Sequence, residues 1–153
     1  MKKTVLFFSV FLFLGFMFSS CGEEPQADPR DQYVGTWSMV AVGSASLYYD
    51  GQVIGTMPYD EKEDNVKITK SGSNELDIDG MIYTLSGSKL TAPTLSETEN
   101  DAETGISIVG TQTFSGNASL GLIVINSNIT GSWSGQGMSG VLSGKATYTF
   151  TKK

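Results

Sequence analysis

Alternation of apolar and polar residues constrains the fold of this chain more than any other feature of its sequence. From Tyr33 onward apolar residues recur at every second position almost throughout, and no window of a dozen residues repeats them at helical spacing. Trp37, Met39 and Ala41, for example, fall on one face of an extended strand. A period of two places successive side chains on opposite faces of a sheet. The sequence therefore predicts a single all-β domain over residues 33–153.

Turn residues divide this domain into about nine or ten short strands. Asp50-Gly51 stands between two alternating segments and predicts a tight hairpin, because both residues tolerate the positive φ of a type I′ turn. The polar stretches 57–65 and 93–104 are predicted to be loops, and the second is expected to be mobile. After the first strand, we expect strands at residues 44–49, 52–56, 66–70, 75–79 continued as 81–86 beyond a bend or bulge at Gly80, 89–92, 106–114, 118–126, 128–134 and 140–150.

The last third of the chain is rich in glycine, with nine glycines from Gly105 to Gly144. In a flat sheet so many glycines only weaken the strands, whereas they permit the sharp coiling and bulges by which a sheet closes on itself. Together with the short consecutive turns, this composition favours an antiparallel up-and-down β-barrel of about 8–10 strands. A β-sandwich is the alternative.

The N-terminal residues indicate an exported protein. Lys2 and Lys3 precede a nearly unbroken apolar run over residues 5–18, which has the length of a secretory signal peptide and is shorter than the about 17–25 residues of a membrane-spanning helix. Two small residues then precede Cys21, the only cysteine. The segment resembles the signal peptide of a bacterial lipoprotein precursor, with a lipobox at Phe18-Ser19-Ser20-Cys21 in which phenylalanine replaces the usual leucine.

This resemblance implies that residues 1–20 are cleaved and that Cys21 carries diacylglycerol and a further acyl chain such as palmitate. An uncleaved anchor, and an ordinary signal peptide with a free Cys21, are the competing interpretations. A lone exposed thiol is reactive in an oxidising compartment, whereas a cysteine whose sulfur forms a thioether to lipid has no free thiol. Two or three acyl chains, at about 0.8 kcal/mol per buried methylene, anchor a protein for long times. We therefore expect Cys21 to tie the mature protein to a membrane.

Residues 21–32 are acidic, contain two prolines and are expected to form a flexible tether between the lipid and the domain. In the lipoproteins that this chain resembles, a short acidic stretch after the cysteine acts as a surface-export signal, and an aspartate in place of Gly22 retains some of them in the inner membrane. The cell envelope is therefore the expected location, with the outer membrane favoured. Surface exposure stays open, since Glu23 and Glu24 also suit a solvated linker.

The charge of the mature chain limits its partners. Without Lys2 and Lys3, eight basic side chains face sixteen acidic ones, so the formal net charge is near −8. Nucleic acid is not an expected partner, because its phosphates require clustered Lys and Arg and the only arginine is Arg30. An acidic body is also repelled by anionic lipids, so that acyl chains rather than a basic patch would hold it to the membrane.

A second resemblance concerns the domain itself. Gly35 and Trp37, in the segment Tyr33-Val34-Gly35-Thr36-Trp37, resemble the Gly-x-Trp motif at the first strand of lipocalins, and residues 33–151 look like the calycin-like lipoproteins of Gram-negative bacteria. The resemblance implies a small barrel in which Trp37 closes the base. The chain departs from lipocalins in having no helix and no arginine after its last strand. Lys145 or Lys152 is expected to take the place of that arginine beside Trp37.

Few residues offer catalytic chemistry. The chain has no histidine, which removes the usual general base, zinc ligand and catalytic triad. Asp77, Asp79 and the acidic residues of 60–64 are nominal candidates for carboxylate catalysis or for binding calcium. A solvated polar face explains Asp77 and Asp79 better, and segment 60–64 lacks the glycine and spacing of a calcium loop. We therefore expect no enzymatic activity, no cofactor and no metal.

Two functions are favoured at this stage, and a hydrolase is a weaker third alternative. The first is non-enzymatic binding of a small apolar or amphipathic ligand in the interior or at the open end of the barrel. The second is an accessory role in an envelope complex, in which the barrel is packed solid and a neighbouring protein docks on its outside. The interior distinguishes them, because only the first requires a cavity.

Replacing the cysteine tests the lipidation hypothesis. Cys21→Ser is expected to move the protein from the membrane fraction to the soluble periplasm, or to leave the signal peptide uncleaved. Membrane fractionation and mass spectrometry of the mature chain measure both effects. A wild-type chain that carries no acyl adduct, with the variant unchanged in membrane content, would refute the hypothesis.

Overall fold

The computed structural model describes residues 27–153, so the predicted signal peptide, the predicted lipobox and Cys21 lie outside the described residues. The described part is built from strands without a helix. The strands are β1 (Gly35–Tyr49), β2 (Gln52–Ser71), β3 (Glu75–Ile78), β4 (Met81–Ser86), β5 (Lys89–Thr91), β6 (Leu95–Asp101), β7 (Ile106–Ser119), β8 (Leu122–Gly135) and β9 (Met138–Lys152).

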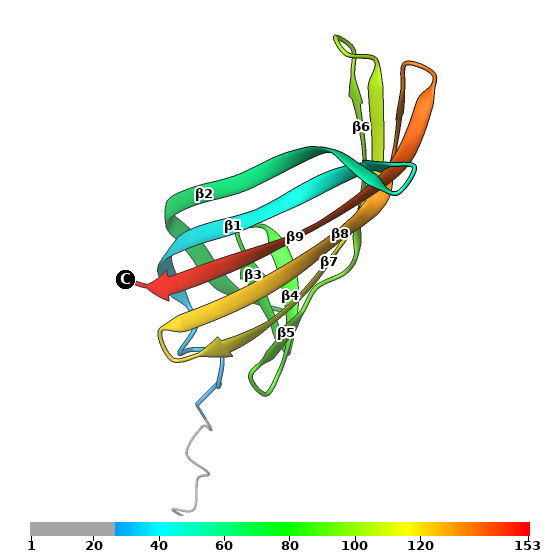
Figure 1. The fold of residues 1–153 in the computed structure, drawn as a ribbon. Coiled ribbons are helices and arrows are strands. Elements are labelled where there is room, and N and C mark those ends of the chain that lie inside the picture. Colours follow the sequence, from blue (N-terminus) through cyan, green and yellow to red (C-terminus); the bar gives the residue numbers. More distant parts are fainter. Residues whose placement is uncertain (1–26) are drawn as a thin grey trace, which may run out of the picture.

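These strands form one antiparallel sheet that closes into a barrel (Figure 1). Neighbours follow in the order β5, β4, β3, β2, β1, β9, β8, β7 and β6, and β5 pairs in addition with residues 115–117 of β7. That pairing completes a closed ring of eight strands, and β6 lies further along the same edge of β7. The predicted all-β, up-and-down barrel is confirmed, and the sandwich alternative is set aside.

Several predicted strand limits were wrong. Residues 57–65, predicted to be a loop, belong to the long strand β2, and the predicted loop 93–104 contains β6. The last third holds three long strands instead of four, because Gly116 and Ser127 lie within β7 and β8 and not at turns. Pairing with β1 and β7 overrides the local polar composition in the first two cases. Pro58 is tolerated because this part of β2 borders a neighbouring strand on one side only.

Two tight turns with positive φ join the first four strands, and the sequence predicted one of them as a hairpin. Asp50 and Gly51 have φ of 48° and 75°, as a type I′ turn between β1 and β2 requires. Asp79 and Gly80 have φ of 52° and 85° and join β3 to β4 as a hairpin, where we expected only a bend or bulge.

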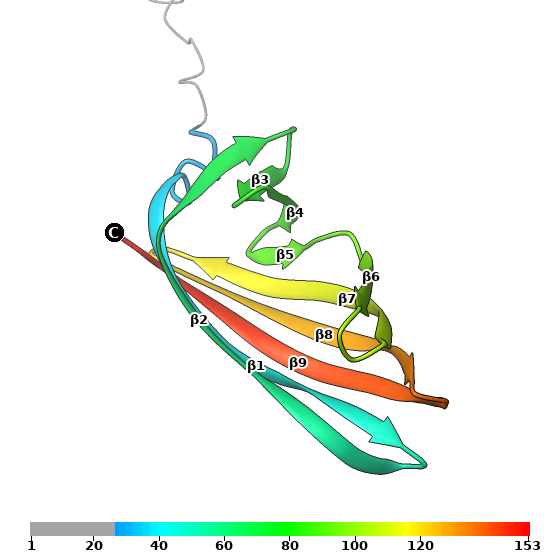
Figure 2. The same cartoon turned by 90° about the horizontal axis from the view of Figure 1, so that it is seen from above.

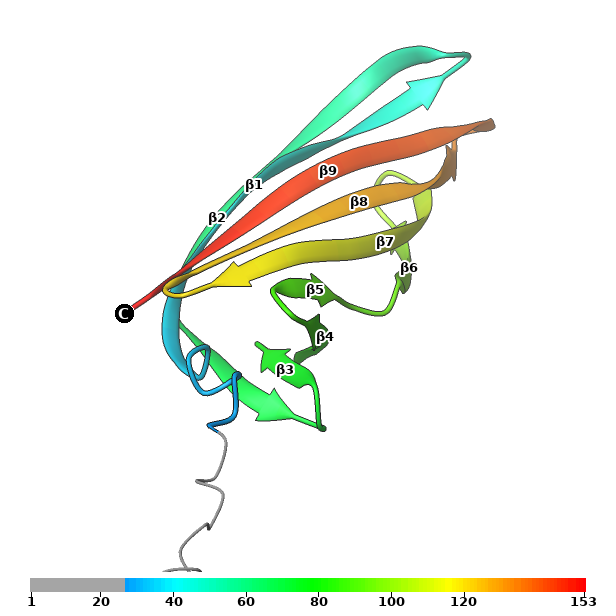
Figure 3. The same cartoon turned by 90° about the horizontal axis from the view of Figure 1, so that it is seen from below.

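Large apolar side chains fill one end of the barrel, which we call the closed end. The buried core there includes Trp37, Ile68, Leu76, Leu90 and Ile123, each 0 % exposed. Short strands β3, β4 and β5 cover this end, while the β1–β2 and β8–β9 hairpins extend away from it (Figures 2 and 3). The closed end is therefore the structural foundation of the domain.

Trp37 lies at the base of this core, as the lipocalin resemblance implied. Its indole Nε1 donates a hydrogen bond to the carbonyl oxygen of Tyr33 at 2.9 Å. Lys152 Nζ lies 5.8 Å from the ring centroid and donates to the carbonyl oxygen of Gln32 at 2.7 Å. Of the two lysines considered for the place beside Trp37, it is therefore Lys152 that takes it, through a cation–π contact.

Residues 28–33, which include part of the predicted tether, contact the barrel. Arg30 forms an ion pair with Asp28 at 2.7 Å and donates to the carbonyl oxygens of Ser71 and Gly72 at 3.1 and 2.8 Å. The hydrogen bonds from Arg30 hold the pKa of the Asp28 carboxyl well below its usual range. This clamp fixes the entering chain to the turn between β2 and β3.

Inward-facing glycines allow neighbouring strands to approach closely where the sheet coils. A Cβ added at Gly43 would lie 2.6 Å from Cα of Ala146 on β9, and one added at Gly131 would lie 2.8 Å from Cα of Gly110 on β7. No L side chain fits at such distances without a shift of the backbone. The glycines of the sequence thus serve the curvature of the barrel, as their number indicated.

Substitution of Gly43 tests this role. Gly43→Ala is expected to lower the free energy of unfolding by about 1–3 kcal/mol, because the added methyl overpacks the β1–β9 contact. Gly55→Ala in the same hairpin is the control, since its nearest neighbour would be Leu47 Cδ1 at 4.0 Å, and we expect a change within about 0.5 kcal/mol there. Urea denaturation measures both. Equal stabilities of the two variants would contradict the close approach.

Candidate functional site

The wall of the barrel is incomplete at the end opposite the closed end. At the closed end, β3, β4 and β5 span the interval between β2 and β7. At the other end, only β6 lies in that interval, because β2 meets β3 only from Ile68 to Ser71. Within the described residues, the outer edges of β6 and of residues 52–66 of β2 therefore have no neighbouring strand. We call the space between them the opening.

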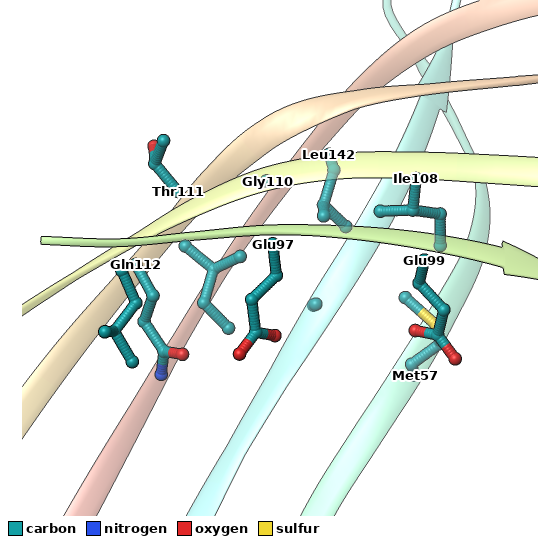
Figure 4. Close-up of a pocket in the computed structure, with 11 residues that line it drawn as sticks. Met57, Glu97, Glu99, Ile108, Gly110, Thr111, Gln112 and Leu142 are labelled. Carbon is teal, nitrogen blue, oxygen red and sulfur yellow. The ribbon is translucent and has the colours of Figure 1, made fainter. Parts of the chain in front are cut away.

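A groove runs over the concave face of the sheet beneath the opening. It has three adjoining parts of about 220, 270 and 330 Å³. All three parts contact Gln112, and neighbouring parts share Met57, Tyr59, Leu95 and Tyr148. Figure 4 shows the part of the groove against β6 and β7. Since side chains of both β2 and β6 line it, the groove spans the opening.

The floor of the groove is mostly apolar. β7, β8 and β9 contribute Ile108, Ile129 and Leu142, and Ala45 of β1 lies beside them. Gly110 leaves space in this floor, since an added Cβ would meet Leu142 Cδ2 at no less than 3.7 Å. Such a surface suits the apolar part of a ligand.

Gln112 marks the boundary between the groove and the packed core. Its Nε2 donates to Ser127 Oγ at 3.0 Å and to Tyr148 Oη at 3.4 Å. Ser127 is 1 % exposed, so this hydrogen bond satisfies a polar group that packing has removed from water. Beyond this network towards the closed end the interior is filled by Phe114, Ile125 and their neighbours.

Glutamates line both sides of the opening. Glu61 and Glu63 of β2 pair in register with the inward-facing Ala41 and Met39, which places them on the concave face. Glu97 and Glu99 of β6 pair with Gly110 and Ile108 and line the groove with them. Figure 4 shows the side chains of Glu97, Glu99 and Gln112 pointing to the same side of β6. The ion pairs found within residues 27–153 involve other acids, namely Asp28, Asp31 and Asp64.

Tyr59 and Tyr83 of the groove have raised pKa values. Tyr59 donates its phenolic hydrogen to Glu61, and this hydrogen bond, with burial, raises the pKa of Tyr59 well above its usual value. Burial raises the pKa of Tyr83 to about 12. The negative charge around the groove comes from the carboxylates, and Lys145 borders its third part.

Of the residues singled out from the sequence, Asp79, Glu61 and Glu63 line the second part of the groove, and the others lie apart from it. Gly35 and Trp37 lie at the closed end. Asp77 accepts a hydrogen bond from the backbone N–H of Gly80 at 2.7 Å, so it stabilises the β3–β4 turn. Segment 60–64 is split between the two faces of β2: Glu61 and Glu63 face inward, while Asp64 contacts Ser38 and Lys153. In the described part of the chain, no three metal-ligating side chains gather at one point.

Sequence reasoning missed Glu97 and Glu99 as groove residues because it assigned them to a loop. Their spacing held the necessary information, since Leu95, Glu97 and Glu99 recur with the same period of two that identifies the other strands.

Comparison with protein-family models, curated proteins and solved structures found no match for this chain. A search of the described residues for a helix long and apolar enough to cross a membrane found none.

Proposed function

We propose that the protein is a non-enzymatic binding module of the cell envelope, anchored through lipid on Cys21, whose groove holds a small amphipathic ligand. The groove itself carries this proposal. Its floor offers Ile, Leu and Ala side chains to an apolar group, and Gln112, the tyrosine hydroxyls and the glutamates offer hydrogen bonds to a polar one.

The division of the interior supports ligand binding over a solidly packed barrel. Packing is complete around Trp37 and Leu90 at the closed end. At the open end, Met57 is 42 % exposed and Tyr59 is 38 % exposed, although both lie on the concave face. Apolar side chains left in contact with water on a concave surface are typical of a site that a ligand covers.

The position of the entering chain fits a tethered receptor. Residues 27–34 join the barrel at the closed end, and the β1–β2 and β8–β9 hairpin tips lie at the opposite end (Figure 1). A lipid on Cys21 would therefore hold the closed end towards the membrane and leave the groove accessible from the other side. Acyl chains suit this arrangement, since the acidic body is repelled by anionic lipid headgroups.

Native mass spectrometry of the full chain purified from its own host tests the proposal. We expect the protein to carry a co-purifying adduct in addition to its acyl chains. Gly110→Leu is expected to remove the adduct, because the new side chain occupies the floor beside Leu142. Val109→Leu adds a methylene group on the outward face of the same strand, where Val109 is 49 % exposed, and should keep it.

An adduct that survives Gly110→Leu would place the ligand elsewhere. The absence of any adduct from the wild-type protein, under conditions that preserve its fold, would contradict binding of a ligand that persists through purification.

A further inference from the structure

The two free strand edges at the opening form a second feature, distinct from the groove floor. We propose that the opening takes an extended segment of another protein, which pairs as an added strand with the free edge of β6 and carries Lys or Arg at alternating positions. This inference goes beyond the proposed function, because it concerns the rim of the groove and holds whether or not a small ligand lies on the floor.

The opening has room for such a strand. Three strands separate β2 from β7 at the closed end, whereas β6 alone occupies the interval at the open end. Neighbouring strands lie about 4.7–4.9 Å apart, so the wall lacks roughly two strand widths there. An added strand would restore part of the missing wall instead of displacing an existing element.

The edge of β6 has the length and the backbone groups that strand addition requires. β6 runs from Leu95 to Asp101 and pairs with β7 along its whole length, which holds it extended. Its other edge presents backbone N–H and C=O groups without a strand partner in the described part of the chain. Such an edge is a template for an extended peptide, with main-chain hydrogen bonds giving affinity and alternate side chains giving specificity.

The side chains of β6 specify the charge of the partner. Its inward face carries Glu97 and Glu99, while Ser96, Thr98 and Asn100 on the outward face are uncharged. A strand added to this edge therefore places every second side chain beside a carboxylate. Glu61 and Glu63 line an adjoining part of the groove from β2 and add to the negative charge around the opening.

The same charges argue against a second copy of this chain as the partner. Pairing β6 with β6 of another copy would bring carboxylates opposite carboxylates on the inward face, which is destabilising. The net charge near −8 of the mature chain adds a general repulsion between copies. The edges thus favour a basic partner of a different sequence.

Peptide binding to the full chain tests the proposal. The acylated protein is purified from its host and held in nanodiscs of zwitterionic phosphatidylcholine, so that the lipid does not attract basic peptides; empty nanodiscs are the blank. Three synthetic peptides that contain the same amino acids are compared by biolayer interferometry. One carries Lys at alternating positions, one carries the same lysines in a single block, and one is the alternating peptide with alternate backbone nitrogens methylated.

We expect the alternating peptide to bind most tightly and the methylated peptide to lose binding, because methylation removes the N–H donors that pair with the edge. Hydrogen exchange should slow in residues 95–101 when the alternating peptide binds. Comparable binding of the methylated peptide would show general charge attraction and overturn strand addition, as would failure of the alternating peptide to bind.

Matched variants test the role of the glutamates. Glu97→Gln with Glu99→Gln is expected to weaken the alternating peptide about two- to thirtyfold, as two opposite-charge cross-strand pairs imply. Asp50→Asn with Asp60→Asn removes the same charge from a turn and from the outward face of β2, and should leave affinity nearly unchanged. Equal effects of the two double variants would overturn the proposal. Circular dichroism of each variant establishes that the barrel is retained.

Discussion

The pairing of β5 with β7 is the constraint on which the rest of the structure depends. Only three residues of each strand take part, Lys89–Thr91 with residues 115–117, yet they turn a curved sheet into a ring. Gly116 lies at the centre of this pairing and is buried against Ile125 of β8, where no side chain fits without a shift. Because β3, β4 and β5 are short, the ring closes at one end only. The packed core at that end and the opening at the other follow from this one contact.

The two ends of the barrel therefore differ in role: one is packed, and the other leaves a surface open to water. The closed end contains Trp37, with Lys152 over its ring, and receives the entering chain through the Arg30 clamp. The open end leaves strand edges, apolar side chains and glutamates in contact with water. An interior of uniform packing would be more stable but would offer no surface to a ligand or a partner. The hydrogen bonds from Gln112 to Ser127 and Tyr148 lie at the boundary between the packed core and the open groove.

Local chemistry in the sequence predicted much of the fold and little of the site. Asp50-Gly51 predicted its hairpin because a type I′ turn depends on two adjacent residues alone. Alternation placed Trp37 on one face with Met39 and Ala41, and the lipocalin resemblance implied that it closes the base of the barrel. Glu97 and Glu99 were assigned to a loop because polarity dominates the composition of their segment, whereas their strand exists through pairing with β7. The β5–β7 closure joins segments that no short-range pattern connects, so the opening that it leaves could not be derived from the sequence.

Hydrogen–deuterium exchange of the full chain, without added ligand or peptide, tests most directly whether the barrel is closed at one end and open at the other. Backbone amides of β5 and of residues 115–117 should be protected, because each lies between two neighbouring strands. In residues 52–66 of β2 and in β6, protected and fast-exchanging amides should alternate, since successive N–H groups point to a paired and to a free edge. Uniform protection along β2 and β6 would show that another element covers these edges and would contradict the open end.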